Sequence, residues 1–263
     1  MRRRLLYAES EQMAALIEQA DKLMESPAFR IVKDEGRTRA GLLACADGTA
    51  IFLKRTAVRS RFAGMLQRIA GSRASRALAG AKMVREAGFH CARPLAALDL
   101  IDVGAVCASY VASEALRDAE ILSHFALGHP GGPRRGYARR KAVSDALARE
   151  LRRLHDAGIY TRDLQETNIM VAELGGVLRF YFLDLEDFRR ARSVSRRQRM
   201  LNLVHLDRSI GRFMSRAARL NFLYAYIGGN PAKVARRRLA VDFLELRQSV
   251  ERRHRDAVTL ARG

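Results

Sequence analysis

Three polar side chains stand at a spacing that suits chemistry on a charged substrate. Asp163, Leu164 and Asn168 follow the order D-L-x-x-x-N, and Asp184 comes directly after the apolar run at residues 181–183. Phosphoryl transfer needs an acceptor for the proton of the attacking hydroxyl and oxygen atoms that hold a divalent cation. We expect Asp163 to accept that proton, and Asn168 and Asp184 to bind the metal.

A lysine and a turn upstream extend this set. Lys54 ends the third of three expected strands, where protein-kinase-like enzymes place a lysine that binds the ATP phosphates. The turn between the first two strands would then cover the nucleotide, and we expect Gly36 and Arg37 to contact it. The short motif around Asp163 would occur often by chance, so the prediction depends on the whole set.

The remaining patterns predict the elements that position these residues. A helix is expected after Ser10, because apolar residues from Met13 to Met24 share one face. Strands are expected over residues 29–54 and 96–111, a helix over 72–88, a long helix over 138–157 and a hairpin over 168–183. A loop is expected at 129–133, and three helices follow residue 195, the last starting near Pro231. This order predicts an α+β fold, with a five-stranded sheet and one helix before a mainly helical part.

The composition indicates a globular protein with an anionic partner. The 263 residues are 48% hydrophobic and carry a formal net charge of +20, which attracts nucleic acid, anionic membranes or phosphorylated substrates. Residues 159–187 hold six acids and two bases, a net charge of −4, whereas residues 188–220 hold ten arginines and one acid, a net charge of +9. An acidic pocket beside a basic shelf suits a site that holds a cation and faces an anion.

Cysteines and apolar runs indicate the compartment. Cys45, Cys91 and Cys107 are odd in number and form no C-x-x-C pair, which favours free thiols in a reducing compartment. No apolar run is long enough to cross a bilayer, and the first residues lack the apolar core of a signal peptide. We therefore expect a cytoplasmic protein.

Longer stretches of the chain resemble one enzyme family. They are Ile-Phe-Leu-Lys-Arg at 51–55, residues 71–74 and 87–96, the Asp163 loop, Phe-Leu-Asp-Leu-Glu-Asp at 182–187, and Arg-Leu-Asn-Phe-Leu-Tyr-Ala-Tyr at 219–226. On these residues the chain resembles the lipopolysaccharide kinase family, protein-kinase-like enzymes that phosphorylate Kdo or heptose in the inner core of lipopolysaccharide. The resemblance runs from about residue 29 to residue 227.

The resemblance implies a protein-kinase-like fold of two lobes. Residues 1–28 would form a helix packed on the N-lobe, residues 29–112 the N-lobe and residues 113–263 the C-lobe. It further implies ATP, Mg²⁺ or Mn²⁺, an anionic glycolipid as acceptor, and peripheral binding at the cytoplasmic face of the inner membrane. Lys54 would bind the alpha and beta phosphates. The residues expected to bind acceptor phosphates or Kdo carboxylates are Arg162, Arg189, Arg190 and Arg192.

Three positions depart from the family pattern. Thr161 stands where the family commonly has His, and we expect altered packing there. The helix after Lys54 normally supplies a glutamate partner, but the matching position lies near Ala77, and Glu86 comes late on the helix. Glu186 stands where the metal motif usually has Gly. Glu186 and Asp187 could contact the metal, face solvent or pair with Arg189 or Arg190. The arginines from 189 to 199 could form a solvated face or a binding surface for lipid phosphates.

Other functions fit parts of the same pattern. An RNA- or ribosome-associated kinase-like ATPase would also use the positive charge, although no aromatic RNA-reading motif is present. A catalytically weak, kinase-like binding protein would explain the missing glutamate, and it would not bind ATP with magnesium. A kinase of small molecules is a further alternative. The sequence leaves the oligomeric state open.

Overall fold

The computed structural model describes residues 1–45, 47–129, 135–228 and 233–260. Its contacts divide the chain into two compact units. Unit 1 consists of residues 1–117 and 182–187, and unit 2 of residues 118–181 and 188–263. The predicted α+β class is confirmed, because an antiparallel sheet and helices make up the fold.

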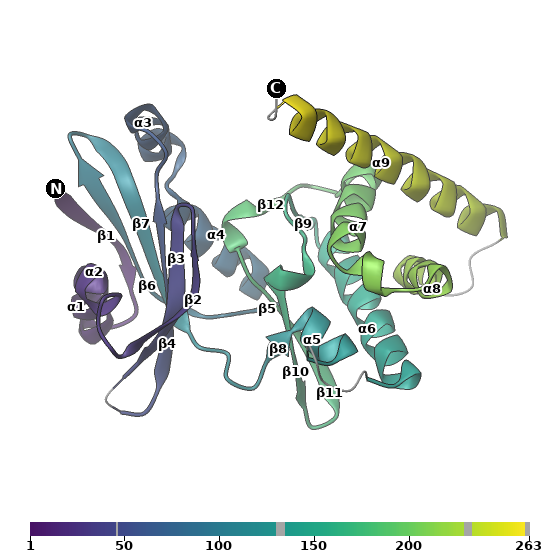
Figure 1. Cartoon of the computed structure of the whole chain (residues 1–263), viewed down its shortest axis with the longest axis horizontal. Coiled ribbons are helices and arrows are strands. Elements are labelled where there is room, and N and C mark those ends of the chain that lie inside the picture. The colour runs from purple at the N-terminus through teal and green to yellow at the C-terminus, as the bar shows by residue number, and fades with distance from the viewer. Residues whose placement is uncertain (46, 130–134, 229–232, 261–263) are drawn as a thin grey trace. The chain divides into compact units, whose positions relative to one another are not determined.

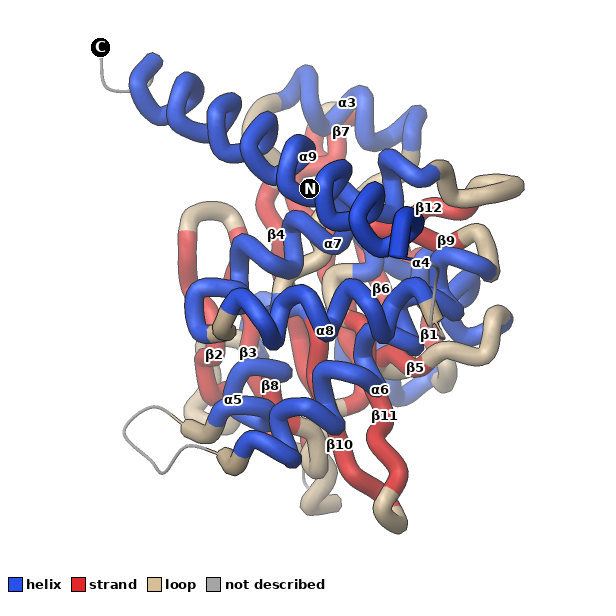
Figure 2. The backbone as a smooth tube through the Cα atoms, turned by 90° about the vertical axis from the view of Figure 1, so that its right-hand side faces the viewer, coloured by secondary structure: helices blue, strands red, loops and turns tan. Residues whose placement is uncertain are grey.

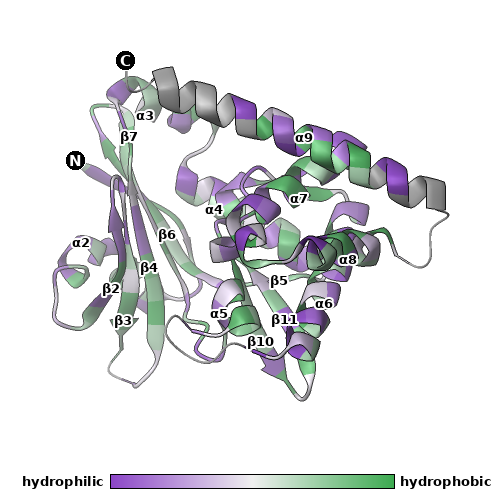
Figure 3. Ribbon diagram, turned by 45° about the vertical axis from the view of Figure 1, so that its right-hand side comes forward, coloured by the Kyte–Doolittle hydropathy of each residue, from purple (hydrophilic) through white to green (hydrophobic). Residues whose placement is uncertain are grey.

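Unit 1 is built on an antiparallel sheet of six strands (Figure 1). In spatial order they are β1 (Arg2–Ala8), β6 (Pro94–Asp102), β7 (Ala105–Glu114), β4 (Ala50–Ala57), β3 (Thr38–Ala44) and β2 (Phe29–Glu35). The last of these is largely hydrophilic (Figure 3), and each of its residues after Phe29 is exposed. The strand therefore forms a solvated edge of the sheet, a feature that limits pairing with other chains.

The prediction of five strands was wrong by one, because β1 was missed. Its charged start, Met-Arg-Arg-Arg, hides a strand that pairs with β6 from Arg2 opposite Ile101 onward. Arg4 Nη2 donates to Oδ2 of the buried Asp99 at 2.7 Å, and the Ser109 hydroxyl donates to Oδ1 at 2.7 Å. A buried carboxylate needs such partners, so an arginine of β1 stabilises the interior.

The helical elements of unit 1 begin near the N-terminus. They are α1 (Glu11–Glu18), α2 (Ala20–Leu23), α3 (Arg61–Ala70), α4 (Arg73–Glu86) and the 3₁₀ helix η2 (Leu185–Asp187), and the short strand β5 (His90–Cys91) follows α4. The Ser10 side chain caps α1 by accepting from the Met13 N–H. Ile17 and Met24 enter the core with Leu53 of β4, so this segment packs on the sheet. The prediction did not contain α3, which is amphipathic but turned outward.

Unit 2 is mainly helical. Its elements are β8 (Glu120–Ile121), α5 (Leu122–Leu127), α6 (Tyr137–Asp156), β9 (Ile159–Thr161), η1 (Glu166–Asn168), β10 (Ile169–Leu174), β11 (Val177–Phe182), β12 (Phe188–Arg190), α7 (Arg196–Ile210), η3 (Gly211–Phe213), α8 (Arg216–Ile227) and α9 (Lys233–Leu260). Figure 2 shows its helices beside the hairpin of β10 and β11. The predicted helices and hairpin thus have counterparts. Most of the expected loop at 129–133 and the helix start at Pro231 fall outside the described residues.

No helix within the described ranges is both long and apolar enough to cross a membrane.

Candidate active site

The Asp163 loop lies in unit 2, between β9 and β10, and folds back on itself. The Asp163 N–H donates to Thr161 Oγ1 at 3.2 Å, and Gln165 Nε2 donates to Asp163 Oδ1 at 2.5 Å. Asn168 Nδ2 donates to the Asp163 carbonyl oxygen at 3.2 Å. Leu164 is buried and anchors the loop. The loop therefore brings together two of the predicted residues, Asp163 and Asn168.

A buried amide on α7 fixes the strand that leads into this loop. Asn202 Oδ1 accepts from the Thr161 N–H at 3.2 Å, and Asn202 Nδ2 donates to the Thr161 carbonyl oxygen at 2.5 Å. The same Oδ1 lies 3.1 Å from His155 Nε2, while His155 Nδ1 lies 2.7 Å from the Tyr226 hydroxyl. Since an amide oxygen can only accept, Nε2 donates and Nδ1 accepts from Tyr226. Asn202 thus holds both backbone polar groups of Thr161, at the start of the loop.

Replacement of Asn202 should destabilise the protein more than replacement of an accessible asparagine. Asn202→Ala leaves the N–H and C=O of the buried Thr161 without partners, which costs about 3 kcal/mol in the free energy of unfolding. Urea denaturation monitored by circular dichroism measures this loss. Asn221→Ala on α8, where the side chain is only partly buried, is the matched control and should change stability by less than about 0.5 kcal/mol. Equal stability of the two variants would contradict this role.

The protonation of His155 should make folding sensitive to mild acid. Burial lowers the pKa of His155 from its ordinary 6.5 to about 4, while the Asn202 hydrogen bond opposes this shift. Above about pH 6.5 the ring is neutral in both states, but from there down to about pH 4 only the unfolded chain binds the proton. Stability should therefore fall as the pH decreases through this window, by up to about 1.4 kcal/mol per pH unit. Urea titrations across the window should show a shallower fall in His155→Gln; equal slopes would reject the assignment.

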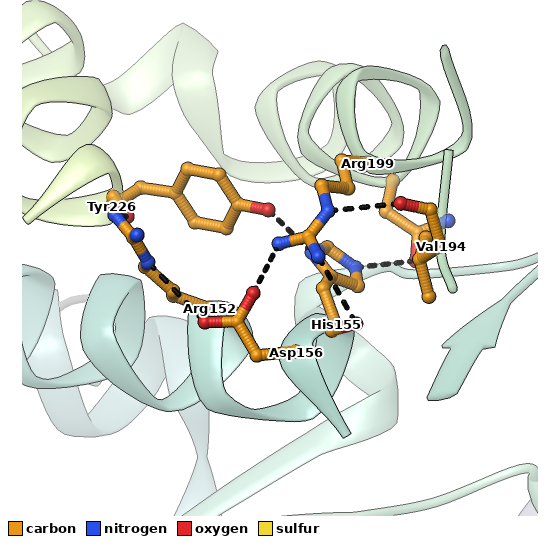
Figure 4. Close-up of polar contacts among 7 residues, drawn as sticks. Arg152, His155, Asp156, Val194, Arg199 and Tyr226 are labelled. Carbon is orange, nitrogen blue, oxygen red and sulfur yellow. Dashed lines mark hydrogen bonds and ion pairs between the residues drawn. The ribbon is translucent and has the colours of Figure 1, made fainter. Parts of the chain in front are cut away.

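An ion-pair cluster covers the same end of α6 (Figure 4). Arg199 Nη1 lies 2.6 Å from Asp156 Oδ1, and Arg199 Nε donates to the Val194 carbonyl oxygen at 3.1 Å. Arg196 forms an ion pair with Asp242 of α9. The sequence did not decide whether these two arginines form a solvated face or a binding surface for lipid phosphates. In the structure, contacts within unit 2 hold both of them.

Other arginines of the predicted shelf lie beside the strand that feeds the Asp163 loop. β12 pairs antiparallel with β9, so that Arg189 stands opposite Tyr160 and Arg190 opposite Ile159. Arg190, Arg192 and Arg162 are exposed, whereas Arg189 is partly buried and donates to the Phe188 carbonyl oxygen at 2.7 Å. Within unit 2, basic side chains are therefore available close to the loop.

Lys54 and Asp184 meet within unit 1. Lys54 Nζ and Asp184 Oδ1 form an ion pair, and both side chains are partly exposed. Asp184 has a φ of 51°, in the left-handed region that few residues other than glycine, asparagine and aspartate occupy. Strain of this kind is concentrated at functional sites. The carboxylate partner that the sequence did not supply for Lys54 is thus Asp184.

Helix α4 is tied to the turn after Asp184 by charge and by close packing. Arg73 Nη1 lies 2.7 Å from Glu186 Oε1, so the buried Glu186 forms an ion pair with Arg73 of α4. A Cβ atom at Gly80 would lie 2.1 Å from the Leu185 carbonyl oxygen, which only glycine permits. Glu86 lies 3.8 Å from Lys82 and serves a local helix pair. The ion pair that ties α4 to the turn therefore consists of Arg73 on the helix and Glu186 on the turn.

Gly36 and Arg37 form the turn between β2 and β3. Gly36 has a φ of 57°, and no atom lies within 4 Å of a Cβ placed there. Both residues are exposed, and the Arg37 carbonyl oxygen accepts from the Ala57 N–H at 2.8 Å. This open turn belongs to the same sheet as Lys54; contact with a nucleotide stays a prediction.

The side chains proposed to bind metal have the right chemistry for Mg²⁺ or Mn²⁺. Asp184 offers carboxylate oxygens, and Asn168 offers an amide oxygen because its nitrogen already donates to Asp163. Such hard oxygen ligands suit Mg²⁺, which is usually held by one or two protein groups together with water and substrate phosphates. Each of these two side chains therefore has the donor chemistry that the cation requires.

Comparison with known proteins identifies the chain's relatives. The model of the Lipopolysaccharide kinase (Kdo/WaaP) family matches residues 32–226. The chain belongs to this family. It is therefore a phosphotransferase of the kinase type, related to the kinases of the lipopolysaccharide core, and the resemblance predicted from the sequence is confirmed.

One of two similar solved structures shows the same fold. The structure entitled "WaaP in complex with acyl carrier protein" is 19% identical, with a TM-score of 0.65, and the match covers 97% of this chain and 99% of that one. The Rio2 kinase–ADP/Mg²⁺–phosphoaspartate complex from Chaetomium thermophilum is 15% identical, with a TM-score of 0.49, and the match covers 87% of this chain and 66% of that one. No curated protein matches the sequence. The first likeness confirms the predicted kinase-like fold of this family member.

Sequence reasoning missed residues that hold the site together. Asn202 and Tyr226 bond to His155, and Arg73 holds the turn after Asp184. A lone asparagine among the buried apolar residues of α7 is a signal that could have revealed Asn202. Nothing in the sequence pairs Arg73 with Glu186, because the two are 113 positions apart.

Proposed function

We propose that this kinase transfers the γ-phosphoryl group of ATP to a sugar hydroxyl, on Kdo or heptose, of the lipopolysaccharide core. Membership of the family supports the class of acceptor. The observation that carries the chemistry is the self-bonded Asp163 loop, in which a carboxylate and an amide occupy one short segment. Lys54 and Asp184 add a cation and a second carboxylate in unit 1.

The proposed reaction assigns one role to each residue. The sugar oxygen attacks the γ-phosphorus, the bond from that phosphorus to the β–γ bridging oxygen breaks, and ADP leaves. Asp163 orients the hydroxyl and accepts its proton, for which the loop keeps the carboxylate in place. Lys54 donates to the alpha and beta phosphates. Asn168 and Asp184 would hold Mg²⁺, which would supply positive charge to the phosphates.

Exposed arginines are proposed to bind the anionic part of the acceptor. Arg190 and Arg192 are exposed on or beside β12, whose neighbour β9 leads into the Asp163 loop, and Arg162 directly precedes Asp163. Arginine suits phosphate and carboxylate groups because its planar fork donates two parallel hydrogen bonds. Arg189 has a weaker claim, because its guanidinium already donates to a backbone carbonyl. We further propose that the enzyme works as a peripheral protein at the cytoplasmic face of the inner membrane.

The acceptor can be tested directly with purified protein and radiolabelled ATP. One reaction contains a Kdo-bearing glycolipid without heptose, and a second contains the heptose-extended core. Transfer to both favours Kdo as the acceptor, and transfer to the second alone favours heptose. Transfer to neither would reject the proposal. The mass spectrum of the core from a deletion strain should show the loss of one phosphate at the same sugar.

The same protein preparation distinguishes an RNA-associated ATPase. Binding to RNA should then be tight and should weaken steeply with salt. ATP hydrolysis would also rise with RNA and not with glycolipid. For the proposed sugar kinase, we expect the opposite dependence.

A further inference from the structure

Helix α3 is docked by one face while its apolar face points outward. Ser60 caps the helix by accepting from the Ala63 N–H, and the helix packs against β7 (Figure 1). At Gly64 the approach is so close that a Cβ atom would lie 2.2 Å from the Val106 carbonyl oxygen. The helix is therefore held against the sheet through its backbone, without the usual apolar side chains.

The opposite face of α3 carries the large apolar side chains. Phe62 is 71% exposed, Met65 46%, Leu66 51% and Ile69 87%. Their spacing of three, four and seven residues places all four on one side of the helix, opposite Gly64. A surface helix normally turns such a stripe toward the core. This face, called here the α3 ridge, is thus inverted relative to an ordinary surface helix.

The α3 ridge lies in a basic stretch of the sequence that contains no acidic residue. Residues 55–85 contain eight lysines or arginines and no aspartate or glutamate, and Arg59, Arg61 and Arg68 are exposed. Arg68 Nη1 donates to the Gly104 carbonyl oxygen at 3.0 Å, next to Val103, which is 69% exposed. Arg68, Val103 and Gly104 line a surface pocket together with Arg2, Arg4 and Asp102, so this pocket holds three arginines and one acid. The ridge therefore combines apolar exposure with net positive charge.

We propose that α3 anchors the kinase to an anionic lipid bilayer. The ridge would insert Phe62, Met65, Leu66 and Ile69 at the boundary of headgroups and acyl chains, while Arg59 and Arg61 contact lipid phosphates. A row of apolar side chains flanked by arginines is the pattern of an interfacial helix. Basic residues add attraction to an anionic surface. The inference deepens the proposed membrane location and is independent of the phosphotransfer reaction.

Single-tryptophan reporters test whether the ridge enters the bilayer. The chain contains no tryptophan, so Ile69→Trp introduces a single tryptophan, on the ridge, that can be excited selectively over the tyrosines. Val32→Trp, on the exposed strand β2 of the same unit, is the matched control because Val32 is 59% exposed. With phosphatidylethanolamine–phosphatidylglycerol vesicles, the Ile69→Trp variant should shift to the blue and be quenched by brominated acyl chains, and the Val32→Trp variant should do neither. An unchanged spectrum for Ile69→Trp would overturn the proposal.

Vesicle flotation separates the apolar and the electrostatic contributions. Phe62→Gln/Ile69→Gln should lower binding to these vesicles at least about tenfold, and Val32→Gln/Val177→Gln should leave it nearly unchanged. Arg59→Gln/Arg61→Gln should lower binding about tenfold, and wild-type binding should fall with salt. Equal binding to phosphatidylcholine alone would overturn the anionic preference. A wild-type dimer that the ridge variant converts to monomer in light scattering would assign the ridge to self-association and overturn the membrane role.

A second readout keeps this test apart from that of the reaction. On a water-soluble, delipidated core acceptor, Phe62→Gln/Ile69→Gln should transfer phosphate as fast as wild type, while on vesicle-embedded acceptor it should be slower. Equal rates on both acceptors would overturn the anchoring role and leave the phosphotransfer proposal intact.

Discussion

Asp163→Asn is expected to fold normally and to lose phosphotransfer by about 10³-fold, the scale of a removed general base. Asparagine keeps an oxygen that can accept from Gln165, and the backbone carbonyl that accepts from Asn168 is unaffected. The loop geometry should therefore survive while the charge and the proton acceptor are lost. The fall should appear in kcat, with the KM for ATP changed less than about threefold, since Asp163 acts on the attacking hydroxyl.

Rapid-quench single-turnover measurements give the chemical step without product release. Asp118→Asn, at an exposed position of unit 2, is the matched control for loss of one negative charge. A rate for Asp163→Asn within about threefold of wild type, at equal thermal stability, would remove Asp163 from the mechanism.

Asp184→Asn should reduce activity about 100-fold and raise the Mg²⁺ concentration needed for half-maximal rate. The neutral amide is a weaker ligand than the carboxylate and no longer balances the charge of Lys54. Asparagine also tolerates the left-handed backbone at this position, where φ is 51°. The loss should therefore arise from metal and nucleotide binding, with the fold retained. Calorimetric titration of ATP with and without Mg²⁺ measures it.

Two comparisons isolate the role of the Asp184 carboxylate. Asp102→Asn removes an exposed charge from the same unit and should leave Mg²⁺ dependence unchanged. Asp184→Ala should lose roughly 1 kcal/mol of stability beyond the asparagine variant, because alanine lacks the local polar contacts that favour a positive φ. If Asp184→Asn bound Mg²⁺-ATP as tightly as wild type, the metal assignment would be wrong.

The sequence predicted those elements whose patterns are local. The long helix α6 shows an apolar stripe, and the hairpin of β10 and β11 turns at a Gly-Gly pair, so both were expected near their observed positions. β1 was hidden because three arginines precede its apolar residues, and its place depends on pairing with β6 far along the chain. α3 was missed although its apolar residues recur at helical spacing after Ser60, so a local signal for this helix was present in the sequence.

The residues of the candidate site likewise fall into those that a local pattern predicts and those that only the tertiary fold brings together. Asp163 and Asn168 could be recognised because their spacing within one loop is itself the signal. The Lys54 partner could not, because Asp184 is 130 positions away and is brought to Lys54 by the tertiary fold. Glu186 was left open between a metal contact, solvent and pairing with a nearby arginine, and its ion pair with Arg73 on α4 was not anticipated. Contacts between distant segments need the packed backbone, which local pattern does not encode.

Two contacts couple the position of α4 to that of the turn that bears Asp184. One is the salt bridge from Arg73 in the first helical turn, and the other is the bare backbone at Gly80, about 10 Å further along the axis. A change that tilted this helix would therefore also move the Asp184 carboxylate away from its position beside Lys54. Any perturbation that shifts α4 should therefore lower activity through the Asp184 carboxylate, and a residue larger than glycine at position 80 should have the same effect.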